Sequence, residues 1–255
     1  MRLLTLGSGT SVPHKTRTAP AFWLDTSAGS ILLDCGPTAA SRMAEEALDW
    51  PGLDAIWISH FHLDHAGGLG PFLFGTKYAD ETAGRNKPLK IFGPEGLGAW
   101  FDAIDASAGY RLRNQPFPLH ILETKPLKEF EILPGIKANT LQTPHTAESR
   151  AISINLGNDR RLVYTSDTGP SEELTAFAHQ AELLLIESSF YQKKPVESHL
   201  EFGEALHIAR KSKAKKTVFT HLYPEWDDID KPGLIKQLDT SNEMHFAEDG
   251  MEFEV

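Results

Sequence analysis

The sequence predicts an α/β fold: a four-layer αββα sandwich in which two central mixed β-sheets pack face to face and helices cover the outer faces. Two observations predict this fold. Each half of the chain begins with several short strands and continues with strands and helices in alternation. The chain has 255 residues, 40% hydrophobic and 24% charged, so it can bury a substantial core. No low-complexity linker or short repeat divides it, and we expect one domain over residues 1–255.

The first half of the chain contains five apolar runs that predict strands. They cover residues 3–6, 20–25, 30–34, 54–58 and 89–92. The second and third runs are predicted to form a hairpin around Ser27-Ala28-Gly29. Helices are expected over 38–48, where Thr38 can act as the N-cap, and over 94–106. Residues 75–88 are polar and contain Gly, which predicts a loop.

The second half repeats this order of elements. Residues 117–142 predict several short strands, with turns at Lys125-Pro126 and Pro134-Gly135. Further strands are predicted at 150–156, 161–165, 182–187 and 216–220. Helices are expected over 171–179 and 202–211, followed by a helix and turn within 228–241. Residues 243–254 offer one or two edge strands.

Charge and composition argue against several classes of protein. The net charge is −10 and the pI is near 5.5, which does not favour nonspecific binding to nucleic acid or to an anionic membrane. No segment approaches the roughly 18 apolar residues of a membrane span, and the first apolar run is too short for a secretory signal. We therefore expect a cytoplasmic protein. Cys35 is the single cysteine, so any metal must be held by His, Asp and Glu.

The motif His60-Phe61-His62-Leu63-Asp64-His65 follows the strand at 54–58. Side chains two residues apart on an extended backbone point the same way, so His60 and His62 can converge on one metal ion. The Gly-rich turn and helix that follow would direct Asp64 and His65 toward a second ion. Imidazole and carboxylate ligands suit zinc, iron or manganese. The alternative, a His-rich surface loop, explains a lone His-x-His better than it explains the full motif.

Three further polar residues follow predicted strands, at positions where active-site residues often lie. They are His145, Asp167 and His221. Each one taken alone could be a capping aspartate or a surface histidine. Together with the first motif they complete a set of seven candidate metal ligands.

In this ordered set of motifs the chain resembles the metallo-β-lactamase-fold hydrolases, and Asp34 matches the early structural aspartate of that family. Within the family it is most similar to the RNase Z group and its small phosphodiesterase relatives. Two more stretches carry this resemblance, Leu6-Gly7-Ser8-Gly9-Thr10 and the segment 88–97. His199, which lies 22 residues before His221, is similar to the extra histidine that donates a proton in those enzymes.

The resemblance implies a site with two divalent metal ions, with zinc as the expected metal and manganese or iron as alternatives. One ion would be held by His60, His62 and His145, the other by Asp64, His65 and His221, with Asp167 bridging them. A hydroxide shared by the two ions would be the nucleophile.

Four residues of the predicted site have a second interpretation. Asp64 would aim the attacking water, but it can also cap the following helix. His199 would be the general acid, or else a surface histidine in a loop. Glu187 would orient a site histidine without binding metal itself, or else it would bond to backbone at the end of its strand. Trp226 either packs in the core or lines the substrate pocket.

The resemblance implies a homodimeric phosphodiesterase that acts on an RNA 3′ end or on a small or cyclic phosphodiester. The RNase Z enzymes carry a tRNA-gripping arm between the motifs matched by His145 and Asp167. Those residues are only 22 apart here, which leaves no room for an arm. The alternative is a lactone or thioester hydrolase, which would not need His199. A di-iron redox protein is disfavoured because it needs a carboxylate in place of His62.

Overall fold

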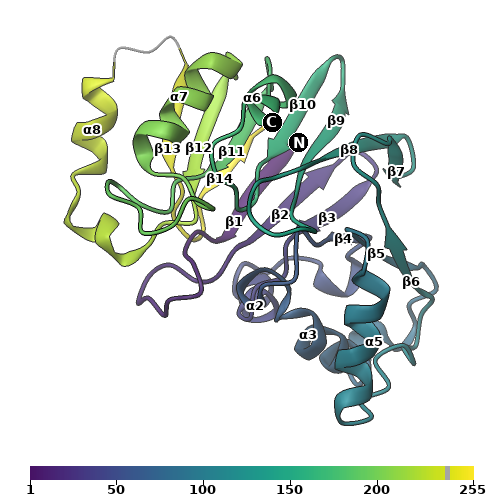
Figure 1. The fold of residues 1–255 in the computed structure, drawn as a ribbon. Helices are drawn as coiled ribbons and strands as arrows, with labels where there is room; N and C mark the ends of the chain where they lie inside the picture. The colour runs from purple at the N-terminus through teal and green to yellow at the C-terminus, as the bar shows by residue number, and fades with distance from the viewer. Residues whose placement is uncertain (239–241) are drawn as a thin grey trace.

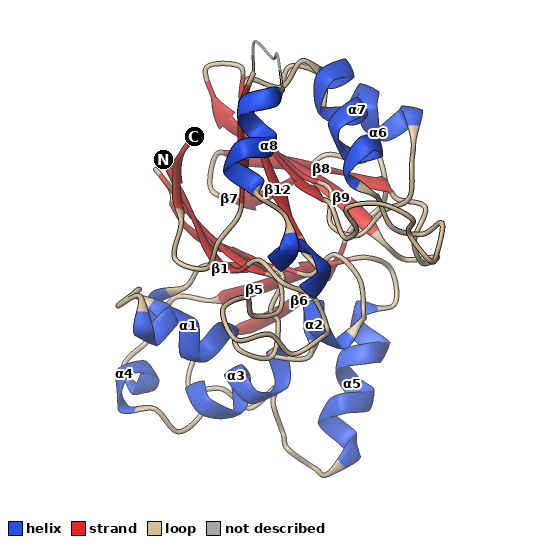
Figure 2. Cartoon of the chain, turned by 90° about the vertical axis from the view of Figure 1, so that its left-hand side faces the viewer, coloured by secondary structure: helices blue, strands red, loops and turns tan. Residues whose placement is uncertain are grey.

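Two seven-stranded β-sheets form the centre of the fold in the computed structural model, which describes residues 1–238 and 242–255 (Figure 1). The sheets pack face to face, and helices cover both outer faces (Figure 2). This is the predicted αββα sandwich of the metallo-β-lactamase fold, so the predicted fold class is confirmed.

The first sheet has the strand order β14-β1-β2-β3-β4-β5-β6. Its strands are β1 (Arg2–Gly7), β2 (Ala21–Thr26), β3 (Gly29–Leu33), β4 (Ala55–Trp57), β5 (Leu89–Gly93), β6 (Leu119–Glu123) and β14 (Glu252–Glu254). The hairpin of β2 and β3 is antiparallel, whereas β3 to β6 run parallel, so the sheet is mixed.

The second sheet has the order β13-β12-β11-β10-β9-β8-β7 and is mixed in the same way. Its strands are β7 (Phe130–Leu133), β8 (Ile136–Gln142), β9 (Arg150–Gly157), β10 (Arg160–Tyr164), β11 (Leu183–Glu187), β12 (Lys216–Thr220) and β13 (Glu243–Phe246). Strands β7 to β10 are antiparallel neighbours and β10 to β13 are parallel ones. The last strand of the chain, β14, returns to the first sheet beside β1.

Three apolar layers hold the sandwich together. The layer between the sheets contains Trp57, Tyr164 and Leu185, and one further layer lies under the helices of each half. The helices over the first sheet are α1 (Ala39–Glu45), α3 (Leu69–Thr76), α4 (Asp80–Ala83) and α5 (Leu97–Ser107). Those over the second are α6 (Glu172–Phe177), α7 (Phe202–Ser212) and α8 (Lys231–Gln237).

The loop predicted over residues 75–88 is partly wrong, because α3 extends to Thr76 and α4 interrupts the segment. The Thr82 hydroxyl donates a hydrogen bond to Ala79 O at 2.9 Å, which helps to hold this short helix. Thr38 precedes α1 as predicted, but its side chain makes no capping hydrogen bond. The predicted turn after α8 falls on residues 239–241, outside the described residues. No helix in the described ranges is both long and apolar enough to cross a membrane.

Gly68 lies where the segment after the metal motif packs closely on the chain after β3. Its N–H donates to Cys35 O at 2.8 Å, and a Cβ at this position would lie 2.1 Å from Gly36 O. We expect Gly68→Ala to lower the free energy of unfolding by about 1–3 kcal/mol, because backbone must move to admit the methyl group. Urea denaturation measures this change.

Gly75, exposed in the same helix, provides the matched control. A Cβ there would meet no atom within 4 Å, so Gly75→Ala is expected to raise stability by up to about 1 kcal/mol through helix propensity. Equal stability of the two variants would show that the contact at Gly68 is not close in solution.

Candidate metal centre

The candidate ligands meet at one edge of the sandwich, where strands from both sheets end. His60 follows β4 of the first sheet, and His145, Asp167 and His221 follow β8, β10 and β12 of the second. Three strand ends near the centre turn through the left-handed backbone region. The φ angle is 58° at Asp34 after β3, 53° at Ser166 after β10 and 59° at His221 after β12. These turns direct the side chains out of the sheets and toward one another.

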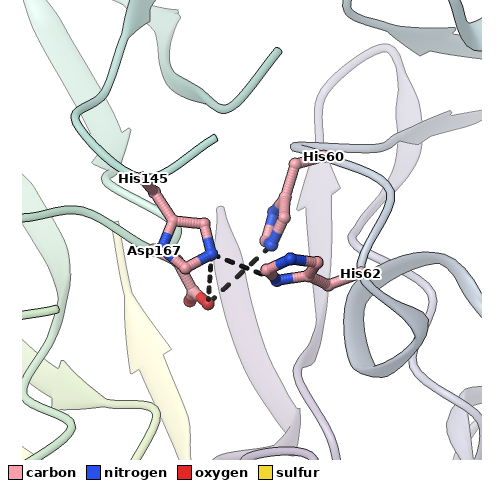
Figure 3. A group of neighbouring side chains, drawn as sticks. All are labelled: His60, His62, His145 and Asp167. Carbon is pink, nitrogen blue, oxygen red and sulfur yellow. Dashed lines mark hydrogen bonds and ion pairs between the residues drawn. The ribbon is translucent and has the colours of Figure 1, made fainter. Parts of the chain in front are cut away.

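Four side chains form the first half of the centre, and Figure 3 shows them facing one another. The ligand atoms of His60, His62, His145 and Asp167 all lie within 4.8 Å of one another. His62 Nδ1 is 3.1 Å from His145 Nε2, and Asp167 Oδ2 is 3.6 Å from His145 Nε2 and 3.8 Å from His60 Nε2. His62 is exposed, so the centre is open to solvent on this side.

Asp64, His65 and His221 form the second half of the centre. Asp64 Oδ2 lies 3.5 Å from His221 Nε2 and 3.7 Å from His65 Nε2. The other oxygen of Asp167, Oδ1, is 3.2 Å from His65 Nε2 and 3.3 Å from His221 Nε2. Asp167 therefore turns one oxygen to each group of histidines, the arrangement that a bridging carboxylate requires.

Four buried ligand atoms have no hydrogen-bond partner within the described part of the chain, although buried polar atoms are normally paired. They are His60 Nε2, His65 Nε2, His221 Nε2 and Asp167 Oδ1. Each faces the space between the two clusters, where a divalent cation would accept its lone pair. The donor set therefore fits a dinuclear metal site.

Asp34 fixes the orientation of the first motif from beneath. Its Oδ2 accepts hydrogen bonds from His65 Nδ1 at 2.7 Å and from Ser59 Oγ at 2.9 Å. It also accepts one from the Tyr164 hydroxyl at 2.8 Å, and Oδ1 accepts one from Ser59 N. Ser59 Oγ lies 3.0 Å from His60 Nδ1 and can accept a hydrogen bond from its N–H. Both histidines are thus held with Nδ1 protonated and Nε2 free for a metal.

Glu187 holds two histidines from the second half of the chain in a similar way. Its Oε1 lies 3.0 Å from His199 Nδ1, and its Oε2 accepts a hydrogen bond from Ser189 Oγ. Ser189 Oγ lies 2.9 Å from His221 Nδ1. The backbone N–H groups of Thr168 and Leu200 also donate to Glu187, which anchors the turns after Asp167 and His199.

Burial and charge set the protonation of the site. Burial lowers the pKa of His60 and His145, with neighbouring histidines adding to the effect, so both are neutral and able to bind metal. Burial raises the pKa of Asp167, but the histidines His221 and His65 outweigh it and hold this pKa well below its usual value. Burial also lowers the pKa of His199, but the hydrogen bond and charge of Glu187 raise it to about 9.

The structure brings every predicted site residue to this centre, and their roles in metal binding and catalysis remain predictions. Asp64 is the second residue of α2 (Leu63–Ala66), whose N-cap is His62, so Asp64 does not cap that helix. Trp226 does not line the centre, because it is fully buried and its Nε1 donates to Ser188 O at 2.8 Å.

Sequence reasoning missed four residues at the centre. Ser59, Tyr164, Ser189 and Tyr223 lie in no recognised motif. Ser59 directly precedes His60, and Ser189 and Tyr223 each follow a predicted site residue by two positions, which is the one signal that could have identified them.

Known proteins resemble the chain over nearly its whole length. A ribonuclease Z of Methanosarcina acetivorans is 25% identical, in an alignment covering 100% of this chain and 98% of that protein. The alignment spans 309 positions, more than the 255 residues here, so the relative contains segments that this chain lacks.

Solved structures share the fold at lower sequence identity. The metallo-β-lactamase fold protein YhfI from Bacillus subtilis has a TM-score of 0.79 and 22% identity, covering 99% of this chain and 98% of YhfI. A diphosphatase of the PhnP family has a TM-score of 0.75 and 21% identity, covering 100% of this chain and 97% of its own.

A family model gives the most specific match, to residues 1–253. Together with the His/Asp centre, it places the chain among the metal-dependent hydrolases of the metallo-β-lactamase fold that are related to RNase Z and PhnP-like phosphodiesterases. The chain belongs to the family described as anti-Pycsar protein Apyc1.

Proposed function

We propose that this protein is a dinuclear metal-dependent phosphodiesterase that hydrolyses a small cyclic nucleotide. The observation that carries the proposal is the position of Asp167 between two groups of histidines, with His199 beside them. The family suggests a cyclic nucleotide substrate, and the PhnP-family neighbour is a diphosphatase, which also acts on phosphate groups. His60, His62 and His145 would hold one ion, Asp64, His65 and His221 the other, and Asp167 both.

Two ions bound there would lower the pKa of water and neutralise charge at the phosphoryl group. Zinc is the proposed metal, although a His and Asp ligand set also accepts manganese and iron. The residues of this chain would hold the ions with seven side chains, of which Asp167 offers both oxygens. Asp64 also has a second oxygen that can accept a hydrogen bond from the attacking water and orient its lone pair.

His199 is proposed to donate a proton to the leaving oxygen. Glu187 and Ser189 both bond to its Nδ1, which leaves Nε2 as the free ring nitrogen. The ring stacks on His221 at 5.4 Å between centroids and lies 4.8 Å from His145, so it borders both halves of the centre. Glu187 would stabilise the imidazolium before transfer and keep Nε2 directed at the substrate.

A small substrate fits this chain better than a tRNA precursor. Only residues 143–149 connect β8 and β9, so no arm extends from this edge of the second sheet. Affinity for nucleic acid depends largely on phosphate contacts from Lys and Arg, and the chain has 25 of these against 35 acidic residues. A lactone or thioester hydrolase is the second candidate, and it would make no use of His199, because those leaving groups depart readily.

The first prediction concerns metal content. We expect wild-type protein supplied with metal to retain two ions per chain, measured by elemental analysis after dialysis. Asp167→Ala should lose both ions or hold them weakly, because one carboxylate serves both groups of histidines. The exposed Asp80, in the first turn of α4, supplies the control: Asp80→Ala should retain two ions. A wild-type protein with one ion or none would contradict the dinuclear site.

The second prediction tests the role of His199. His199→Ala should retain both metal ions and lose roughly 10²–10⁴ in kcat on a diester with an alkoxide leaving group. The loss should be small on a matched diester with a p-nitrophenolate leaving group, which needs no proton. His207→Ala, which changes an exposed histidine on α7, should behave as wild type. Equal losses on both diesters would exclude the acid role, and loss of metal would make His199 a ligand.

The third prediction concerns substrate size. At equal enzyme concentration, kcat/KM for a cyclic nucleotide should exceed that for a full-length tRNA precursor. Added salt should change the first reaction little, because it depends on no extended set of phosphate contacts. Efficient cleavage of the precursor after its discriminator base would refute this prediction and would require another surface to bind the RNA.

A further inference from the structure

An aromatic pair borders the metal centre. Tyr223 lies two residues after His221, and Phe190 lies three residues after Glu187. Their rings stack with centroids 4.6 Å apart and planes at 21°. Phe190 is 8% exposed, whereas Tyr223 is half-buried, so Phe190 backs a residue that stays partly exposed.

The pair stands on the His199 side of the centre. The Tyr223 ring centroid is 6.4 Å from that of His199 and 6.1 Å from that of His221, with planes nearly perpendicular. Phe190 also contacts His199 edge to face, at 6.2 Å. A group attached to the oxygen that His199 protonates would therefore lie against Tyr223.

Tyr223 is held rigidly. Its N–H donates to Ser189 O at 3.2 Å, and its carbonyl accepts from Arg17 Nη2 at 3.3 Å. Arg17 is itself fixed by Asp227 at 2.6 Å. The backbone at Tyr223 is thus held in place and its ring is stacked on Phe190, so a ligand that stacks on the ring does not have to order it first.

The other aromatic pair beside the centre is less suitable as a binding surface. Phe61 stacks on Trp100 with centroids 5.5 Å apart and planes at 14°. The edge of Phe61 is packed against Gly96, where a Cβ would lie 3.5 Å from the ring. Both rings join the apolar layer under the helices of the first sheet, so this pair is part of the core packing.

We propose that Tyr223, backed by Phe190, stacks on the nucleobase of the substrate and makes the enzyme selective for nucleotides over other phosphodiesters. The inference rests on the proposed phosphodiesterase function and on the place of His199 in it. A planar ring that carries no charge suits a base, because every base presents a π-face, whereas the phosphate belongs at the metal ions.

The test compares two substrates with the same cyclic diester: a nucleoside 3′,5′-cyclic phosphate and the corresponding methyl riboside 3′,5′-cyclic phosphate, which lacks the base. We expect wild type to prefer the nucleotide in kcat/KM by roughly 5- to 150-fold, the range for one base–aromatic stack. Tyr223→Leu should abolish most of this preference, chiefly through KM, whereas Tyr223→Phe should retain it. Tyr191→Leu, which alters a neighbouring ring packed on Phe202 and Trp226, should also retain it.

Each other outcome has a definite meaning. Wild type that hydrolyses both substrates equally would overturn the inference and leave the phosphodiesterase function standing. A Tyr223→Leu protein that keeps the preference, or a preference lost in Trp100→Leu instead, would also overturn it. Wild type that contains two ions and hydrolyses neither substrate would refute the proposed function itself. Because the wild-type comparison needs no variant, the test stands even if Tyr223→Leu fails to fold.

Discussion

The hydrogen bonds to Asp34 are the interaction on which the rest of the centre depends. This carboxylate is fully buried, and a buried charge is tolerated only when its oxygens are fully paired. Ser59 and His65, from the first half of the chain, donate hydrogen bonds to it, and so does the Tyr164 hydroxyl from the second sheet. This one carboxylate is therefore paired, holds the motif from His60 to His65 in place and joins the two halves of the sandwich directly beneath the candidate metal ligands.

Glu187 repeats this arrangement in the second half of the chain. Each carboxylate follows or ends a parallel strand, and each bonds one histidine directly and a second through a serine: Asp34 to His65 and, through Ser59, His60; Glu187 to His199 and, through Ser189, His221. The two sheets repeat a strand order, and the hydrogen bonds by which a carboxylate and a serine hold two histidines repeat with it. The two halves differ in what they support, since only the second adds a histidine beyond the seven candidate ligands.

Local signals in the sequence were sufficient to predict the sandwich and the set of candidate ligands. His60 and His62 follow an apolar run that predicts a strand, and their spacing of two residues puts both side chains on one side of an extended backbone. Asp167 follows another such run. The serines that bond to the histidines carry a weaker signal, because the histidine partners of Ser189 lie 10 and 32 residues away in the sequence. The alternatives for Trp226 could not be resolved for the same reason. The short helix at η2 (Pro224–Asp228) turns Trp226 into the core and leaves Tyr223, three residues earlier, at the centre.

The left-handed turns at the ends of the strands have an evolutionary consequence. A non-glycine residue in this region costs on the order of 1 kcal/mol, and glycine would relieve the cost at Asp34 or His221 only by removing a group that the centre uses. Glycine at position 34 would also leave Ser59, His65 and Tyr164 without their shared buried acceptor, so selection for stability and selection for the centre both retain aspartate at this turn.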